Sequence, residues 1–198
     1  MAAEERNEQE RFVLRNARHL AADYMTRTLR EGDVAVDATM GNGHDTQFLC
    51  RLVGETGHVY AFDVQEAAVS STRARLREAG LEDRATLILD GHQTMAAHVP
   101  APVQAVMFNL GWLPGAAHIV TTKTSTTLEA VRAAAELLAP GGVMTICVYP
   151  GHEEGTRELN ALLEWAAGLD VRMYNVLHHH FICASPQTPR LILVQRNL

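Results

Sequence analysis

The chain has 198 residues, of which 47% are hydrophobic and 20% are charged, and its formal net charge at pH 7 is -6. This length suits a single domain with one substantial core, and the composition excludes a chain that is disordered over most of its length. The acidic balance argues against a protein that coats long stretches of nucleic acid, but it does not exclude a small RNA footprint.

The start of the chain and its cysteines set further expectations. No apolar run approaches the roughly 20 residues that cross a bilayer, and the polar start MAAEERNEQER lacks the apolar core of a signal peptide. We therefore expect a cytoplasmic protein with no membrane association, in which residues 1–11 form a flexible N-terminus and residues 12–198 form one domain. Cys50, Cys147 and Cys183 are far apart, which favours buried reduced thiols over a redox or metal role.

Helical and strand-like patterns alternate along the chain. An amphipathic helix is expected over Phe12–Leu29, with Gly32 after it. The strands expected after it are Val34–Asp37, His58–Asp63, Ala85–Leu89, Val103–Asn109, Val143–Tyr149, Val171–Leu177 and Leu191–Arg196. The helices expected between them are Asp45–Val53, Gln65–Ala79, His92–Val99, Thr126–Leu138 and Glu153–Ala167. This alternation predicts an α/β fold with a seven-stranded, mostly parallel sheet and helices on both faces.

The segment between the last two expected strands, His178–Pro189, is too short and too rich in proline for a crossover helix. A hairpin is therefore expected there, and the last strand should run antiparallel to the others. His178, His179 and His180 alternate sides in such a segment and cannot present three ligands at once, so we expect no metal site.

The stretch VDATMGNGHDT, from Val36 to Thr46, has the pattern of a buried strand followed by a cofactor-binding loop. Gly41 and Gly43 let the backbone turn tightly and approach a ligand, and the amides at the start of the next helix offer donors to a carboxylate. A dinucleotide fingerprint that starts at Gly41 needs its third glycine at position 46, which is Thr46. The spacing therefore argues against NAD.

Acidic residues end three successive strands or follow them directly: Asp37, Asp63 and Asp90. Asp63, about 20 residues beyond Gly43, can accept hydrogen bonds from both hydroxyls of a ribose. Each aspartate could instead cap the helix that follows it. Together with the glycine loop, the three acids fit a charged sulfonium nucleoside better than a dinucleotide. The predicted cofactor-binding residues are Asp37, Thr39, Gly41, Asn42, Gly43, Asp45, Asp63, Gln65, Asp90, Gly91, His92 and Asn109.

The fourth expected strand runs into FNLGWLPG, Phe108 to Gly115. The side-chain oxygen of Asn109 and nearby backbone carbonyls can accept hydrogen bonds from an amine and so direct its lone pair along the line of attack. The segment resembles the Asn-Pro-Pro-Tyr loop of amino-methyltransferases, with other residues in place of Pro-Pro-Tyr. Trp112 could stack on a base or lie over a sulfonium, or it could be a core or interface residue.

Polar residues follow in AAHIVTTKTSTT, Ala116 to Thr127. Thr126 and Glu129 would form a capping box for the next helix. The residues before that box suit contacts to a phosphate or a base, with a solvated loop as the alternative; they are His118, Thr121, Thr122 and Lys123.

After the fifth expected strand, the motif YPGHEEG brings His152 to the cleft or to a helix cap. We assign it substrate positioning first and proton acceptance second. The predicted catalytic residues are Asn109, His152 and His118. The predicted substrate-binding residues are Gly111, Trp112, His118, Thr121, Thr122, Lys123, Tyr149 and His152.

As a set, these motifs resemble those of the bacterial family first labelled "putative rRNA methylases": DATMGNGHDT, Asp63–Gln65, FNLGWLPGAAH followed by TT, and YPGHEEG. The likeness spans nearly the whole chain except its first dozen residues. The order of the expected elements also resembles the Rossmann-like class I fold of S-adenosylmethionine-dependent methyltransferases. Thr39 departs from the glycine that general methyltransferases carry at this point of the loop, but it agrees with this family.

The resemblance implies an enzyme that uses S-adenosylmethionine to methylate the aminomethyl group of 5-aminomethyl-2-thiouridine at the tRNA wobble position. The residues alone reach only an amino-methyltransferase, in which a neutral amine attacks the sulfonium methyl in line. The alternatives are methylation of rRNA or of a small-molecule amine, a nicotinamide-dependent reductase and a non-catalytic RNA-binding module. Since one small acidic domain must grip a tRNA, we expect either a homodimer or contacts limited to the anticodon arm.

Overall fold

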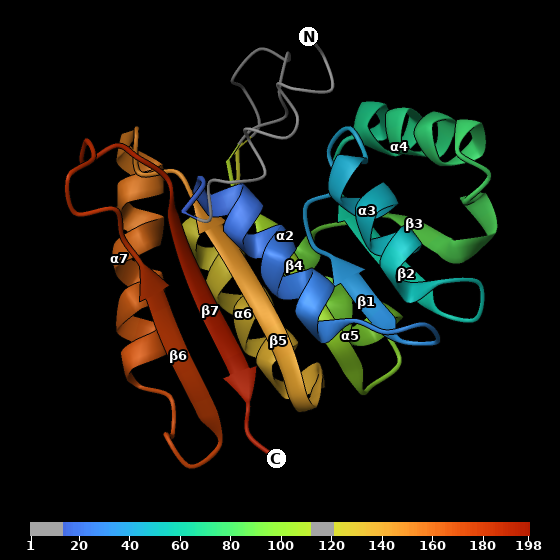
Figure 1. Cartoon of the computed structure of the whole chain (residues 1–198). Coiled ribbons are helices and arrows are strands. Elements are labelled where there is room, and N and C mark those ends of the chain that lie inside the picture. Colours follow the sequence, from blue (N-terminus) through green and yellow to red (C-terminus); the bar gives the residue numbers. More distant parts are fainter. Residues whose placement is uncertain (1–13, 112–120) are drawn as a thin grey trace, which may run out of the picture.

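The computed structural model describes residues 14–111 and 121–198 of the chain. Seven strands in these ranges form one sheet with helices on both of its faces (Figure 1). No helix of the described ranges is long and apolar enough to span a bilayer. In chain order the elements are α2 (Ala17–Thr28), β1 (Val34–Asp37), α3 (His44–Val53), β2 (His58–Asp63), α4 (Glu66–Glu78), β3 (Ala85–Leu89), α5 (Met95–His98), β4 (Val103–Asn109), α6 (Thr124–Leu137), β5 (Leu138–Val148), α7 (Glu153–Ala167), β6 (Tyr174–His179) and β7 (Arg190–Arg196).

The strands lie in the order β3-β2-β1-β4-β5-β7-β6. All neighbours from β3 to β5 pair in parallel, whereas β7 pairs antiparallel with both β5 and β6. The expected hairpin and the antiparallel last strand are confirmed. The last strand lies one place inside the sheet, so that β6 forms the outer edge (Figure 1).

Both faces of the sheet are buried. Successive residues of a strand point to opposite faces, and helices cover each face. In β1, Ala35 belongs to the core that α2, α3 and α4 cover, while Val36 belongs to the core that α5, α6 and α7 cover. Both side chains are fully buried. This burial on two sides explains why the central strands read as continuous apolar runs in the sequence.

The connections diverge beside β1, and this divergence positions the site. The chain leaves β1 through α3 to reach β2 on one side, and it later enters β4 on the other side of β1. The loops after β1 and β4 therefore open a crevice at the carboxyl ends of the two strands, which is where open α/β sheets bind their ligands.

Several element starts differ from those expected. The helix expected over Phe12–Leu29 is α2, which begins at Ala17, where the Asn16 side chain accepts a hydrogen bond from the His19 amide and caps it; residues 12 and 13 lie outside the described ranges. β6 begins at Tyr174, three residues later than expected. The amides of Met173 and Tyr174 both donate to the carbonyl oxygen of Asp170. Residues 171–173 therefore form a turn and not the start of the strand.

The start of α6 also corrects the sequence interpretation. The helix begins at Thr124, and its cap comes from α7: Glu154 Oε1 accepts hydrogen bonds from the Thr124 amide at 2.9 Å and the Thr124 hydroxyl at 2.8 Å. Thr126 lies inside the helix and donates to the Lys123 carbonyl oxygen. The expected capping box at Thr126 is therefore wrong, because a distant acid caps the helix instead.

Two other expectations need correction. β5 begins at Leu138 and not at Val143, since its first residues continue the sheet directly after α6. All three cysteines are free thiols, but only Cys50 and Cys147 are buried, whereas Cys183 is exposed.

Candidate functional site

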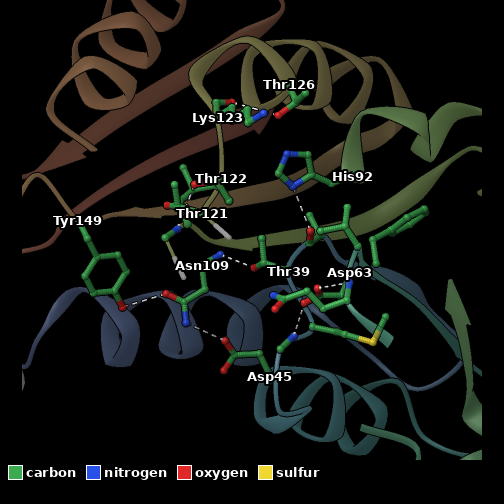
Figure 2. Close-up of a pocket in the computed structure, with 18 of the residues that line it drawn as sticks. Thr39, Asp45, Asp63, His92, Asn109, Thr121, Thr122, Lys123, Thr126 and Tyr149 are labelled. Carbon is green, nitrogen blue, oxygen red and sulfur yellow. Dashed lines mark hydrogen bonds between the residues drawn. The ribbon is translucent and has the colours of Figure 1, made fainter. Parts of the chain in front are cut away.

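A cleft of about 880 Å³ opens at the carboxyl ends of the parallel strands (Figure 2). Its walls come from the loops after β1 to β5 and from the β6–β7 hairpin, which contributes Gln187 and Pro189. The volume lies within the roughly 300–1,000 Å³ typical of small-molecule and cofactor sites.

The loop after β1 turns on two glycines in the left-handed region, with φ +50° at Gly41 and +78° at Gly43. A Cβ atom at Gly43 would lie 2.8–2.9 Å from atoms of Thr72 on α4. The Thr72 hydroxyl in turn donates to the Gly41 carbonyl oxygen at 3.0 Å. The glycines therefore let α4 pack against the loop while His44 and Asp45, which begin α3, line the cleft.

Asp37 lies behind this loop, outside the residues that line the cleft. It is 1% exposed, and its carboxylate accepts hydrogen bonds from the Thr39 amide at 3.1 Å and the Thr46 hydroxyl at 2.6 Å. Burial, with the charge of Asp45 nearby, raises the pKa of Asp37 to about 7. Asp37 braces the loop from within, and its contact with the cofactor stays a prediction.

Asp63, at the end of β2, lies on the cleft wall. Its carboxylate accepts hydrogen bonds from the Gly41 amide at 3.1 Å and the Gln65 amide at 3.0 Å. An ionised carboxylate can accept about four hydrogen bonds, so acceptor capacity remains for a ribose. Desolvation raises the pKa of Asp63, and the two amides offset part of that rise. The two amides also fix the direction of the carboxylate.

Asp90, directly after β3, is hydrogen-bonded to the short helical turn that follows, whose N-cap is Gly91. Its carboxylate accepts hydrogen bonds from the Gly91 amide at 2.7 Å and the Thr94 hydroxyl at 2.9 Å. The side chain is 44% exposed and also lies on the cleft wall. Asp90 therefore stabilises the short helical turn that follows, and His92 lines the cleft beside it.

His92 is 8% exposed and lines the cleft. Its Nδ1 lies 3.2 Å from the Ala38 carbonyl oxygen. Because a carbonyl can only accept, Nδ1 carries the hydrogen, and Nε2 of the neutral ring is an acceptor. Burial lowers the pKa of His92 and so favours the neutral ring. An exocyclic amine such as that of adenine is a suitable donor for Nε2.

Asn109 ends β4 at the centre of a hydrogen-bond network (Figure 2). Its main-chain amide donates to Thr39 Oγ1 at 2.7 Å, and its side-chain Nδ2 donates to Asp45 Oδ2 at 3.2 Å. The Tyr149 hydroxyl donates to Asn109 Oδ1 at 2.9 Å. Thr39 thus joins the loop after β1 to the end of β4 through a hydroxyl that glycine lacks.

Asp45 fixes which way the Asn109 amide faces. An ionised carboxylate only accepts, so the Nδ2 end of the amide faces Asp45 and the Oδ1 end faces Tyr149. Arg18 on α2 donates to the other oxygen of Asp45 at 3.2 Å and also lines the cleft. Burial raises the pKa of Tyr149 to about 12, which keeps its phenol protonated as a donor. Asn109 Oδ1 retains a second lone pair for another donor.

The segment after β4 is closed by two hydrogen bonds between its ends. The Gly111 amide donates to Thr122 Oγ1 at 3.1 Å, and the Thr122 amide donates to the Gly111 carbonyl oxygen at 3.0 Å. Thr121, Thr122 and Lys123 all line the cleft. Trp112 and His118, both predicted to contact the substrate, lie outside the described residues.

His152 both caps α7 and lines the cleft. Its Nδ1 accepts a hydrogen bond from the Gly155 amide at 3.1 Å. The neutral ring therefore carries its hydrogen on Nε2 and uses the lone pair of Nδ1 in the cap. This arrangement favours substrate positioning over proton acceptance.

The cleft fits S-adenosylmethionine by the chemistry of its donors and acceptors. Asp63 offers a carboxylate to the ribose hydroxyls, and the adjacent Val64 is an apolar side chain, 59% exposed, that suits one face of an adenine ring. Gly41 and Asn42 lie at the turn before α3, whose first amides suit a carboxylate. Of the predicted cofactor residues, all line the cleft except Asp37 and Gly43.

Sequence reasoning missed Arg18, Val64 and the hairpin residues Gln187 and Pro189. Arg18 precedes Asp45 by 27 positions and reads in the sequence as ordinary surface charge. The position of Val64 directly after Asp63, the acid expected to bind the ribose, could have indicated its role. No sequence motif marks Gln187 or Pro189 as part of the site. In the parts of the chain that the structure describes, no group of three or more His, Cys, Asp and Glu side chains could hold a metal ion.

Comparisons with known proteins agree with this geometry. The family model described as "Putative rRNA methylase" matches residues 59–195. The "tRNA (mnm(5)s(2)U34)-methyltransferase, chloroplastic" of Arabidopsis thaliana is 37% identical over 170 residues, which are 81% of this chain and 62% of the plant protein. The chain therefore spans less than two thirds of that relative.

Two solved structures are similar over nearly the whole chain. One is a "putative rRNA-methylase" from Clostridium thermocellum, with TM-score 0.91 and 41% identity over 93% of this chain and 100% of that one. The other is a "putative methyltransferase" from Streptococcus mutans in complex with SAH, with TM-score 0.84 and 36% identity over 93% of this chain and 99% of that one. The chain belongs to the "Putative rRNA methylase" family of S-adenosylmethionine-dependent methyltransferases with the class I fold.

Proposed function

We propose that the protein transfers a methyl group from S-adenosylmethionine to the aminomethyl group of 5-aminomethyl-2-thiouridine at the tRNA wobble position. The observation that carries the proposal is the fixed amide of Asn109, which keeps an acceptor at the end of β4 beside the cofactor loop. The printed name of the plant relative, a methyltransferase of mnm(5)s(2)U34, supports this substrate.

When bound, S-adenosylmethionine supplies a methyl group on a cationic sulfur. Asn109 Oδ1 would accept an N–H of the substrate amine through its remaining lone pair and so hold the nitrogen in the direction of attack. Positioning two reactants in this way can contribute roughly 7–11 kcal/mol to catalysis. We assign further substrate contacts to Gly111, Thr121, Lys123 and His152, which lie on the same wall.

The amine must also lose its charge, because an aminomethyl group is largely protonated in neutral water and only the neutral form is nucleophilic. Arg18 lines the cleft, but Asp45, whose Oδ1 lies 3.2 Å from Arg18 Nη2, offsets its charge. Burial of the substrate in the cleft disfavours the ammonium form and so favours the reactive amine.

The decisive experiment incubates the protein with labelled S-adenosylmethionine and tRNA that carries 5-aminomethyl-2-thiouridine, followed by nucleoside mass analysis. We expect one new nucleoside, 5-methylaminomethyl-2-thiouridine. Matched samples are the same tRNA with an unmodified wobble uridine, and rRNA. Label in rRNA alone, or no labelled nucleoside, would refute the assignment to the aminomethyl group.

The manner of tRNA binding is a separate part of the proposal. We propose a homodimer that contacts the anticodon arm, because the chain is acidic and one edge of its sheet is open. The edge strand β6 exposes Val176 (40%) and Leu177 (49%), and an edge strand offers unpaired backbone groups to a second copy. We place the enzyme in the cytoplasm with its substrate. A monomer by light scattering that methylates tRNA at full rate would remove the dimer.

A further inference from the structure

Three successive amides at the end of β4 are each tied to a different element. Asn109 N donates to a side chain of the loop after β1, Leu110 N donates to a carbonyl of β5, and Gly111 N donates to a side chain just before α6. The acceptors are Thr39 Oγ1 at 2.7 Å, Cys147 O at 3.0 Å and Thr122 Oγ1 at 3.1 Å. The position of the Asn109 side chain therefore depends on all three anchors.

The third anchor works only if the Thr122 hydroxyl is turned the right way. The Gly111 amide can only donate, so the hydroxyl must offer it a lone pair and send its own hydrogen elsewhere. That hydrogen goes to Glu158 Oε2, 3.1 Å away. Glu158 therefore sets the orientation of the hydroxyl that holds Gly111.

Glu158 lies on α7 and is 2% exposed, so it is among the few buried acids of the described residues. Its other oxygen accepts a hydrogen bond from the Thr127 hydroxyl at 2.5 Å. Burial raises the pKa of Glu158, and the two hydroxyls offset part of that rise. A buried carboxylate is costly unless it is well hydrogen-bonded. Since it does not line the cleft, it must act on the site through Thr122.

We propose that Glu158 is a positioning residue for methyl transfer, which acts through Thr122 and Gly111 to hold the amine-binding end of β4. The inference rests on the proposed function for its substrate, and it gives Thr122 a new role: the Thr122 hydroxyl is an internal anchor and not an RNA contact. The peptide after Asn109 is fixed from the helix layer beneath the cleft, without contact between Glu158 and either ligand.

Two nearly isosteric substitutions test this role. Thr122→Val removes the hydroxyl and keeps the shape, whereas Thr122→Ser keeps the hydroxyl. We expect Thr122→Val to lower kcat on tRNA by about tenfold, which is the size of effect of one lost hydrogen bond. KM for S-adenosylmethionine should stay within about twofold, and Thr122→Ser should restore most of kcat. Glu158→Leu should resemble Thr122→Val in kcat, because it removes both acceptors and leaves the Thr122 hydroxyl without the partner that orients it.

Thr127→Val is the control for a merely structural effect. It removes the other hydrogen bond to Glu158, so its melting temperature should fall about as far as that of Thr122→Val, while kcat stays near that of the unmodified protein. Equal loss of kcat in both variants, or full kcat in Thr122→Val, would overturn the inference. Inactivity of the unmodified protein on tRNA would instead overturn the proposed function.

Discussion

At the scale of single residues, the amide of Asn109 is the group on which the proposed chemistry depends most. Asn109→Ala removes the acceptor for the amine but leaves the main-chain bond to Thr39 in place. We expect kcat to fall by at least about 100-fold, as is usual when a transition-state hydrogen-bonding group is lost. Calorimetry should show S-adenosylmethionine affinity within about threefold. Turnover close to that of the unmodified protein would exclude this role.

Asp37 gives a second prediction at this scale, on stability and pH. Its folded pKa, about 7, lies above the ordinary value of 3.8, so the folded state favours the protonated form. Its contribution to stability is therefore complete below about pH 4 and is lost as the pH rises through 7. The asparagine side chain in Asp37→Asn cannot ionise, and the Thr46 hydroxyl can turn to accept from its amide.

The Asp37→Asn variant should therefore gain stability relative to the unmodified protein between pH 4 and pH 7, by up to about 4 kcal/mol, with no further change above pH 8. Thermal unfolding of both proteins across this pH range measures the difference. A gap that stays constant with pH, or one that changes in the opposite direction, would contradict the raised pKa.

At the scale of elements, the packing of α4 against the turn between β1 and α3 can be tested by substituting Gly43, which lies in this turn, and Gly80, which follows α4 and has a similar backbone conformation. Gly43 has φ +78° and a Cβ there would meet Thr72, whereas Gly80 has φ +68° and open space around it. Gly80→Ala should lose only the roughly 1–2 kcal/mol of left-handed strain. Gly43→Ala should lose at least about 1 kcal/mol more and weaken S-adenosylmethionine binding. Equal losses by thermal unfolding would mean that α4 does not constrain the loop.

Elements that local sequence controls were predictable, and those set by distant contacts were not. The strands Val34–Asp37 and Val103–Asn109 were predicted with their correct bounds, because burial on both faces leaves an uninterrupted apolar run. The start of α6 was not, since its cap is Glu154, 30 residues away. Asp37 was predicted at the right strand end, but its hydrogen bond with Thr46 was not, because the sequence does not show that Thr46 points inward.

At the scale of the whole molecule, the proposed homodimer can be tested at the sheet edge that β6 forms. Leu177 lies on the edge strand β6 and is 49% exposed. Leu177→Lys adds a charge there, as natural edge strands do to prevent pairing. We expect the variant to be monomeric by light scattering and to bind tRNA more weakly, with S-adenosylmethionine affinity unchanged. A dimer that persists in the variant would move the interface elsewhere.

The hydrogen bond from the Asn109 amide to Thr39 joins the end of β4 to the loop after β1, 70 positions away in the chain. We expect heterotropic linkage from it, because a ligand that orders one of these segments reduces the conformational entropy that the other ligand must remove. Since such coupling is reciprocal, SAH and tRNA should each raise the affinity for the other by the same factor. Thr39→Val removes the acceptor, so both factors should fall toward one in calorimetric titrations. Cooperativity between donor and acceptor would then be governed by a single hydroxyl group.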